Sequence, residues 1–168
     1  MHKTTWTIIG ITLVLLIGVV YVLNSNQKQA KQGNVEQLHV TTHDFQKVLA
    51  YESDYMGDAS NISNLFNNLP LSNHKGTIEL DSDNFICVVN YDAKSDEKVA
   101  IYNATAAFVL IKNLETVDMR FSDRSYEITR KQVEGWFGPD FEALIDPTVF
   151  KEKIQQPLLE NNTGEWIK

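Results

Sequence analysis

Four side chains in this sequence have the types and spacing that catalysis would use. Glu52, Asp54 and Asp58 lie close together, and paired carboxylates can divide the roles of general acid and general base. Cys87 is the one cysteine of the chain, and a thiolate is a strong nucleophile where its pKa is lowered. These residues support the hypothesis of a small hydrolase that uses Cys87 or the three carboxylates.

The sequence around these four residues nevertheless favours structural roles. Cys87 lies in the apolar run FICVVNY, which is typical of a buried strand, and burial raises the pKa of a thiol and lowers its reactivity. The three carboxylates lie in a polar stretch that is typical of a solvated loop. A partner histidine for Cys87 would have to come from a distant part of the chain, because such residues meet only in the folded protein.

Metal and nucleotide sites lack the residues that they need. His39 and His43 are four positions apart and would share a helix face, but HVTTH is a poor helix former and zinc needs a third ligand. The run DSDN, residues 81–84, lacks the glycine and the glutamate that complete a calcium-binding loop. No nucleotide-binding or serine-hydrolase motif occurs in the sequence. The sequence therefore predicts neither a metal ion nor a cofactor.

One helix is strongly marked in the stretch YMGDASNISNLFNNLP, residues 55–70. Its apolar residues recur at the spacing of a single helix face, which comprises Ile62, Leu65, Phe66 and Leu69. Asp58 or Ser60 can cap the first turn, Gly57 permits a sharp turn before it, and Pro70 ends the helix. We expect Asp58 to be a cap, although an aspartate that caps a helix can also face a cleft.

Two hairpins and a buried helix make up the centre of the chain. Alternating residues predict paired strands in GTIELDSDNFICVVNYD, residues 76–92, and in ETVDMRFSDRSYEITR, residues 115–130. Between them, EKVAIYNATAAFVLIKNL, residues 97–114, is apolar on most sides and predicts the most buried helix. Asn103 and Thr105 are its polar exceptions, and each needs a partner from the backbone or from a ligand.

The last part of the chain is predicted to be helical. Thr129 and Gln132 have the spacing of a capping box, Asp146-Pro147 starts a further helix, and Pro157 ends it. Together the elements predict an α+β fold. We expect a two-layer sandwich, in which helices pack on one face of an antiparallel sheet of about four strands, preceded by one N-terminal transmembrane helix.

Residues 1–24 are expected to anchor the protein in the membrane as a single span. The uncharged run that begins at Trp6 is long enough to cross a hydrocarbon core, and Trp6 and Tyr21 lie near its ends, where aromatic rings prefer the interface. A cleaved signal peptide is the alternative, but no well-formed cleavage site follows the run. A polar linker at 25–37 and an extracytoplasmic domain at 38–168 are expected to follow, although the flanking lysines are nearly balanced between the two sides.

Composition narrows the possible partners. The net charge is -7 and the sequence pI about 5.0, and no cluster of lysine and arginine is present, so nucleic acid is an unsuitable partner. Hydrophobic residues make up 43% of the chain, which is sufficient for a packed core. Acidic lipid and acidic wall polymer are poor electrostatic partners because of the same negative charge. The expected partners are the membrane, through residues 1–24, and an envelope protein, a peptide or a wall fragment.

Two of these stretches together carry a resemblance to a known family. YMGDASNISNLFNNLP, followed by GTIELDSDNFICVVNY, is similar to the family of domain of unknown function 4825 over roughly residues 39–130. The matching positions are Tyr55, Gly57, Asp58, Leu69, Pro70, Ile78, Glu79, Leu80, Asn90 and Tyr91. The resemblance implies an extracytoplasmic, membrane-anchored protein of low-GC Gram-positive bacteria, in a family whose domain is sometimes attached to membrane-embedded sensor proteases. It implies no reaction and no catalytic residue.

Two classes of function therefore stay open. The first is a binding or sensory module of the cell envelope without enzymatic activity, whose candidate ligand-binding residues are Tyr55, Gly57, Asp58, Tyr91 and Asn103. The second is a small envelope hydrolase that uses Cys87 or the carboxylates of Glu52, Asp54 and Asp58. Polar side chains that converge in a pocket would favour the hydrolase, and a hydrophobic surface groove would favour the binding module.

Overall fold

The computed structural model describes residues 37–160 and Trp166, and the chain from residue 37 onward forms one compact unit. The expected anchor at 1–24 and nearly all of the expected linker at 25–37 lie outside the described residues. Within the part of the chain that the structure describes, no helix has both the length and the apolar character that a membrane crossing requires.

Four strands form one sheet in the order β1-β2-β3-β4. Their bounds are Lys75–Asp81, Ile86–Tyr91, Thr116–Arg120 and Ser125–Thr129. The pairs β1–β2 and β3–β4 are antiparallel, so both predicted hairpins are confirmed. One face of the sheet is buried, because Cys87, Val89, Val117 and Met119 lie side by side in the two central strands and point into the core.

The predicted antiparallel arrangement is wrong at the centre of the sheet, where β2 and β3 run parallel. Ile86 lies opposite Thr116, and Asn90 lies opposite Arg120. The reason is the helix between the two strands: α3 (Glu97–Leu110) returns the chain to the end of the sheet at which β2 begins. The fold is therefore α+β with a mixed sheet of four strands.

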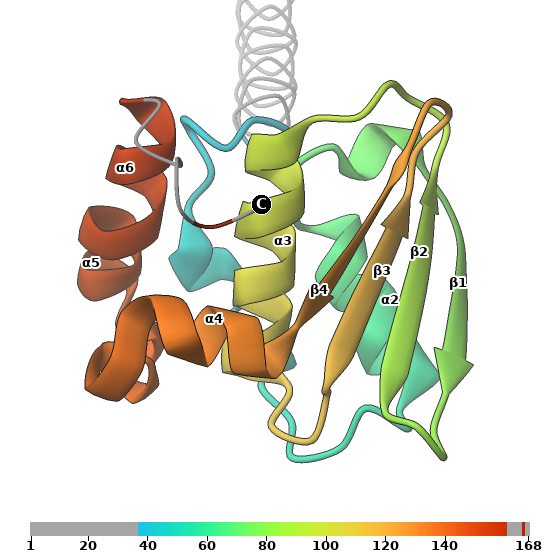
Figure 1. Ribbon diagram of the computed structural model, residues 1–168, viewed down its shortest axis with the longest axis horizontal. Helices are drawn as coiled ribbons and strands as arrows, with labels where there is room; N and C mark the ends of the chain where they lie inside the picture. Colours follow the sequence, from blue (N-terminus) through green and yellow to red (C-terminus); the bar gives the residue numbers. More distant parts are fainter. Residues whose placement is uncertain (1–36, 161–165, 167–168) are drawn as a thin grey trace, which may run out of the picture. The chain divides into compact units, whose positions relative to one another are not determined.

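The helices lie on one side of the sheet, in two tiers (Figure 1). α2 (Ala59–Asn67) and α3 pack against the sheet, and the helices that follow β4 lie on the far side of α3. Tyr102 of α3 meets Phe150 from this second tier edge to face, with 5.1 Å between the ring centroids. Because α3 is covered on both sides, nearly all of its residues are buried, as the sequence predicts for this helix.

The C-terminal tier begins at the predicted capping box, since Thr129 and Gln132 cap the start of α4. Its elements are α4 (Arg130–Phe137), the 3-10 turns η3 (Gly138–Asp140) and η4 (Glu142–Ile145), α5 (Pro147–Phe150), the π-helical turn η5 (Lys151–Gln155) and α6 (Gln156–Leu159). Asp146 caps α5, as predicted. The prediction that Pro157 ends this helix is wrong, because Pro157 lies in the first turn of α6, where a missing N–H is tolerated.

A buried polar cluster ties the start of the domain to its end. His43 Nε2 lies 2.8 Å from the carbonyl oxygen of Asn68, which can only accept, so Nε2 carries the proton and Nδ1 accepts from the Tyr102 hydroxyl at 2.7 Å. Gln155 Nε2 donates to the carbonyl oxygens of Val40 and His43, at 2.5 Å and 2.9 Å. Burial lowers the pKa of His43 from 6.5 to about 4, so the imidazole is neutral at physiological pH.

Candidate functional site

Three of the predicted ligand-binding residues lie at the start of α2. Asp58 is the cap of this helix, because its Oδ1 accepts from the backbone N–H groups of Ser60 and Asn61, each at 3.0 Å. Tyr55 is 70% exposed and Gly57 is also exposed, in the loop that leads to the cap. The capping role predicted for Asp58 is confirmed, and none of the three candidates lines the cleft described below.

The other two candidates, Tyr91 and Asn103, contact each other in the core. Asn103 Nδ2 donates to the Tyr91 hydroxyl at 3.2 Å and to the carbonyl oxygen of Pro70 at 2.9 Å. Burial raises the pKa of Tyr91 above its ordinary value. Asn103 Oδ1 and Thr105 Oγ1 are buried without a hydrogen-bond partner among the described residues. The Asn103 amide nitrogen is thus bonded to the Pro70 backbone and to Tyr91, and the contact between Asn103 and Tyr91 joins α3 to β2.

Cys87 is fully buried on the core face of β2, as its sequence context predicts. Burial raises the pKa of its thiol to about 12, against an ordinary value of 9.0. At neutral pH almost none of the side chain is therefore present as the reactive thiolate.

We expect native Cys87 to react with a maleimide at least about a hundredfold more slowly than the same thiol in denatured protein, because both access and thiolate fraction are reduced. Labelling rates measured by mass spectrometry with and without denaturant give this ratio. Equal rates in the two states would show that the thiol is accessible and would restore Cys87 as a possible nucleophile.

The three carboxylates that the sequence places together separate in the fold. Lys112 Nζ lies 2.7 Å from Asp54 Oδ1 and 3.8 Å from Glu52 Oε1, whereas Asp58 is occupied at the cap of α2. The bond to Asp54 raises the pKa of Lys112, and Glu52 and Glu142 act in the same direction. Glu52 and Asp54 thus belong to an ion-pair group around one lysine.

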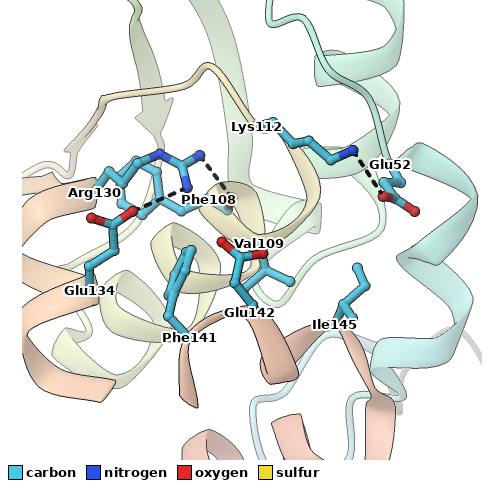
Figure 2. Close-up of a pocket in the computed structure, with 9 residues that line it drawn as sticks. All are labelled: Glu52, Phe108, Val109, Lys112, Arg130, Glu134, Phe141, Glu142 and Ile145. Atoms are coloured by element: carbon cyan, nitrogen blue, oxygen red, sulfur yellow. Dashed lines mark hydrogen bonds and ion pairs between the residues drawn. The ribbon is translucent and has the colours of Figure 1, made fainter. Parts of the chain in front are cut away.

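A cleft of about 310 Å³ lies at the C-terminal end of α3 (Figure 2). Four stretches of chain that are distant in sequence form its walls: the residue after the 3-10 helix η1 (Phe45–Tyr51), the end of α3, α4, and the η4 segment. The lining residues are Glu52, Phe108, Val109, Lys112, Arg130, Glu134, Phe141, Glu142 and Ile145. The cleft thus combines apolar walls with charges of both signs.

Arg130 holds the cleft together from one side. Its Nη2 donates to the carbonyl oxygens of Phe108 and Ile111, at 2.9 Å and 2.7 Å, and its Nε donates to that of Leu114 at 2.9 Å. The last turn of α3 contains no basic residue, so Arg130 satisfies carbonyl groups that the helix leaves open. The guanidinium carbon also lies 5.5 Å and 5.6 Å from the ring centroids of Phe108 and Phe141. Burial lowers the pKa of Arg130, although a guanidinium remains charged.

The glutamates of the cleft differ in how they are engaged. Glu134 Oε1 lies 3.8 Å from Arg130 Nη1, and Glu52 lies at the same distance from Lys112. The Glu142 carboxylate forms no hydrogen bond and no ion pair with any residue that the structure describes, although its charge acts to raise the pKa values of Lys112 and Arg130. In Figure 2 its carboxylate lies beside Phe141 and close to Val109.

Of the cleft residues, sequence reasoning singles out Glu52 alone. Its other members lack a shared motif, because the fold alone brings the four stretches together. One local signal exists: Arg130 is the first residue of α4, where a positive charge is unfavourable beside the helix dipole. A residue that is unfavourable in its own helix is explained by contacts elsewhere in the fold, and here those contacts are with the free carbonyl groups at the end of α3.

Comparison with known proteins identifies one family. A family model described as Domain of unknown function (DUF4825) matches residues 48–131, which is half of the chain. No curated protein and no solved structure matches. The matched part contains the sheet, α2, α3 and Arg130, whereas Glu134, Phe141, Glu142 and Ile145 lie beyond its end.

Proposed function

The chain belongs to the DUF4825 family, and on that premise we propose that it is a binding or sensory module of the bacterial cell envelope. Residues 1–24 hold the protein in the membrane, and the folded domain lies outside the cytoplasm. The ligand of the module binds in the cleft at the end of α3. The ligand is a peptide, a wall fragment or part of an envelope protein.

The cleft is the observation that supports this proposal. Ligand sites are concave and combine apolar walls with polar groups that orient the ligand, and this cleft has four apolar and five charged lining residues. Its floor is rigid, because Arg130 ties the end of α3 to the start of α4 by three hydrogen bonds. The hydrolase alternative gains no comparable support, since Cys87 is buried with a raised pKa and the carboxylates of Glu52 and Asp54 are paired with Lys112.

The location can be tested with a cysteine placed at Tyr55, which is exposed, in cells that express the full chain. Cys87 is buried, so its labelling in the parent protein gives the background level. A membrane-impermeant maleimide should label the Tyr55→Cys variant far more than the parent. Labelling of intact cells is the expected result. Labelling only after permeabilisation would place the domain in the cytoplasm and contradict the proposed location.

Binding can be tested with a photo-reactive phenylalanine at Ile145, inside the cleft, and at Leu159, which is exposed on α6, as the matched control. Irradiation of cells should add a ligand mass to the Ile145 variant and not to the Leu159 variant. Equal adducts at both positions, or none at Ile145, would contradict a ligand in the cleft.

A further inference from the structure

We infer that the cleft at the end of α3 receives a ligand with a cationic amine on an apolar body, and that Glu142 is the residue that binds the amine. This inference rests on the proposed function, because it names the class of ligand for the same cleft. Three features of the lining lead to it: an excess of carboxylates over cations, one carboxylate without a hydrogen bond or ion pair among the described residues, and apolar walls beside that carboxylate.

The two cations of the cleft differ in how far internal partners already occupy their N–H groups. Three of the five N–H groups of Arg130 donate to backbone carbonyls, and the remaining nitrogen faces Glu134. The Arg130 side chain is only 12% exposed, and Phe108 and Phe141 lie against its guanidinium. Lys112 donates to Asp54 at 2.7 Å, and its side chain is 61% exposed, so it keeps N–H groups free. An anion could reach Lys112, but it would meet the three carboxylates of the lining.

The carboxylates of the cleft retain hydrogen-bond acceptor capacity for a ligand. Glu142 is exposed and has no hydrogen-bond or ion-pair partner among the described residues, so its four acceptor sites are open to a ligand. Glu52 and Glu134 lie 3.8 Å from their cations, which is beyond hydrogen-bond distance, and each retains acceptor capacity. Three carboxylates against two cations leave the lining with a net negative charge. These acceptors favour an N–H donor that carries positive charge.

The apolar walls define the rest of the ligand. Phe108, Val109, Phe141 and Ile145 line the cleft, and Figure 2 shows Glu142 beside Phe141 and next to Val109. A ligand that places an ammonium at Glu142 therefore lays its carbon chain or ring on these side chains. A volume of about 310 Å³ is at the small end of ligand sites, which suits a single side chain or a small amine. The lysyl side chain of a peptide and a free alkyl or aryl amine share this chemistry.

Three probes of matched shape test which ligand charge the cleft prefers. The measurement uses the full chain in a neutral detergent. The probes are phenylbutylamine, phenylbutanoate and phenylbutanol, which carry a positive, a negative and no charge on the same apolar body. Isothermal titration should give the tightest binding for the amine, and added salt should weaken it because the contact is partly exposed. Acetyl-phenylalanyl-lysine amide, used in parallel, presents the ammonium on a peptide. Binding of the dipeptide but not of the free amine would assign the ligand to a peptide.

Variants of Glu142 test the residue itself. Glu142→Gln should weaken binding of the amine by about tenfold, because an ionic hydrogen bond is replaced by a neutral one. Glu142→Lys should reverse the preference, so that phenylbutanoate binds more tightly than phenylbutylamine. Glu127→Gln removes one carboxylate from the exposed face of β4 and should leave amine binding unchanged. Circular dichroism of each variant verifies the fold, in which the Glu142 carboxylate has no hydrogen bond and no ion pair within the described chain.

Two results would overturn the inference. Tighter binding of phenylbutanoate than of phenylbutylamine by the parent protein would assign the cleft to anions, and an unchanged affinity in Glu142→Gln would remove Glu142 from the site. Neither result affects the proposed function, which fails separately if cross-linking from Ile145 captures no ligand.

Discussion

Replacement of Arg130 by alanine should lower the free energy of unfolding by about 3–5 kcal/mol. The three carbonyl groups that accept from its guanidinium would lose a charged donor at distances of 2.7–2.9 Å. Phe108 and Phe141 would also lose the flat cation that lies against their rings. Denaturant unfolding followed by circular dichroism measures the change.

Two further substitutions separate the causes of this effect. Arg130→Lys keeps the charge but cannot reach three carbonyls at once. Its free energy of unfolding should therefore fall by more than half of the loss that Arg130→Ala causes. Arg120→Ala removes an exposed arginine whose one ion pair, with Asp118, lies in the sheet, and it should cost at most about 1 kcal/mol. If Arg130→Ala unfolds like Arg120→Ala, the guanidinium does not support the end of α3.

Acidification from pH 7 to pH 4 should remove about 3 kcal/mol of stability through His43 alone. Burial is the main cause of its low native pKa, about 4, whereas the ordinary value in the unfolded chain is 6.5. Between these two values the unfolded chain binds a proton and the folded chain does not, so each pH unit lost favours unfolding by about 1.4 kcal/mol. Well above pH 6.5 the imidazole is neutral in both states and makes no contribution to the slope.

The measurement is the free energy of unfolding as a function of pH for the parent, for His43→Gln and for His39→Gln. His43→Gln is less stable at pH 7, because it alters the contacts to Tyr102 and Asn68, but its curve should be flatter between pH 6.5 and 4. His39 is exposed, so His39→Gln should keep the slope of the parent. Parallel curves for all three proteins would show that His43 is not a buried neutral histidine.

The features that local sequence predicted are those with local causes. The caps at Asp58, Thr129 and Asp146 follow from side-chain oxygens next to a helix start, and all three are present. The burial of Cys87 and of α3 follows from apolar composition. The direction of β2 relative to β3 has no local cause, because it depends on where α3 docks. Pro157 illustrates the same point: a wide π-helical turn before it allows a proline that would otherwise end a helix.

The candidate site was less accessible to sequence reasoning than the fold. Tyr55, Gly57 and Asp58 lie in a turn that precedes a helix, and such turns have the same residues whether or not they bind a ligand. A buried amide such as that of Asn103 needs partners, and Tyr91 and the Pro70 carbonyl are the partners of its nitrogen. The cleft at the end of α3 joins residues up to 93 positions apart, from Glu52 to Ile145, so no motif in one stretch of sequence could define it.

The contacts of Gln155 determine which part of the domain would bear a pulling force applied at its first described residue, Gln37. Tension applied there would load the hydrogen bonds from Gln155 to Val40 and His43, and the stacking of Phe45 on Phe150 at 3.8 Å between centroids. Part of this load passes into α5 and η5, and part passes through the hydrogen bond from Leu71 N–H to the Leu38 carbonyl oxygen toward β1. α5 directly follows the stretch that ends in Ile145, one wall of the cleft. Pulling on the start of the domain and filling of the cleft would therefore strain the same short segment of chain.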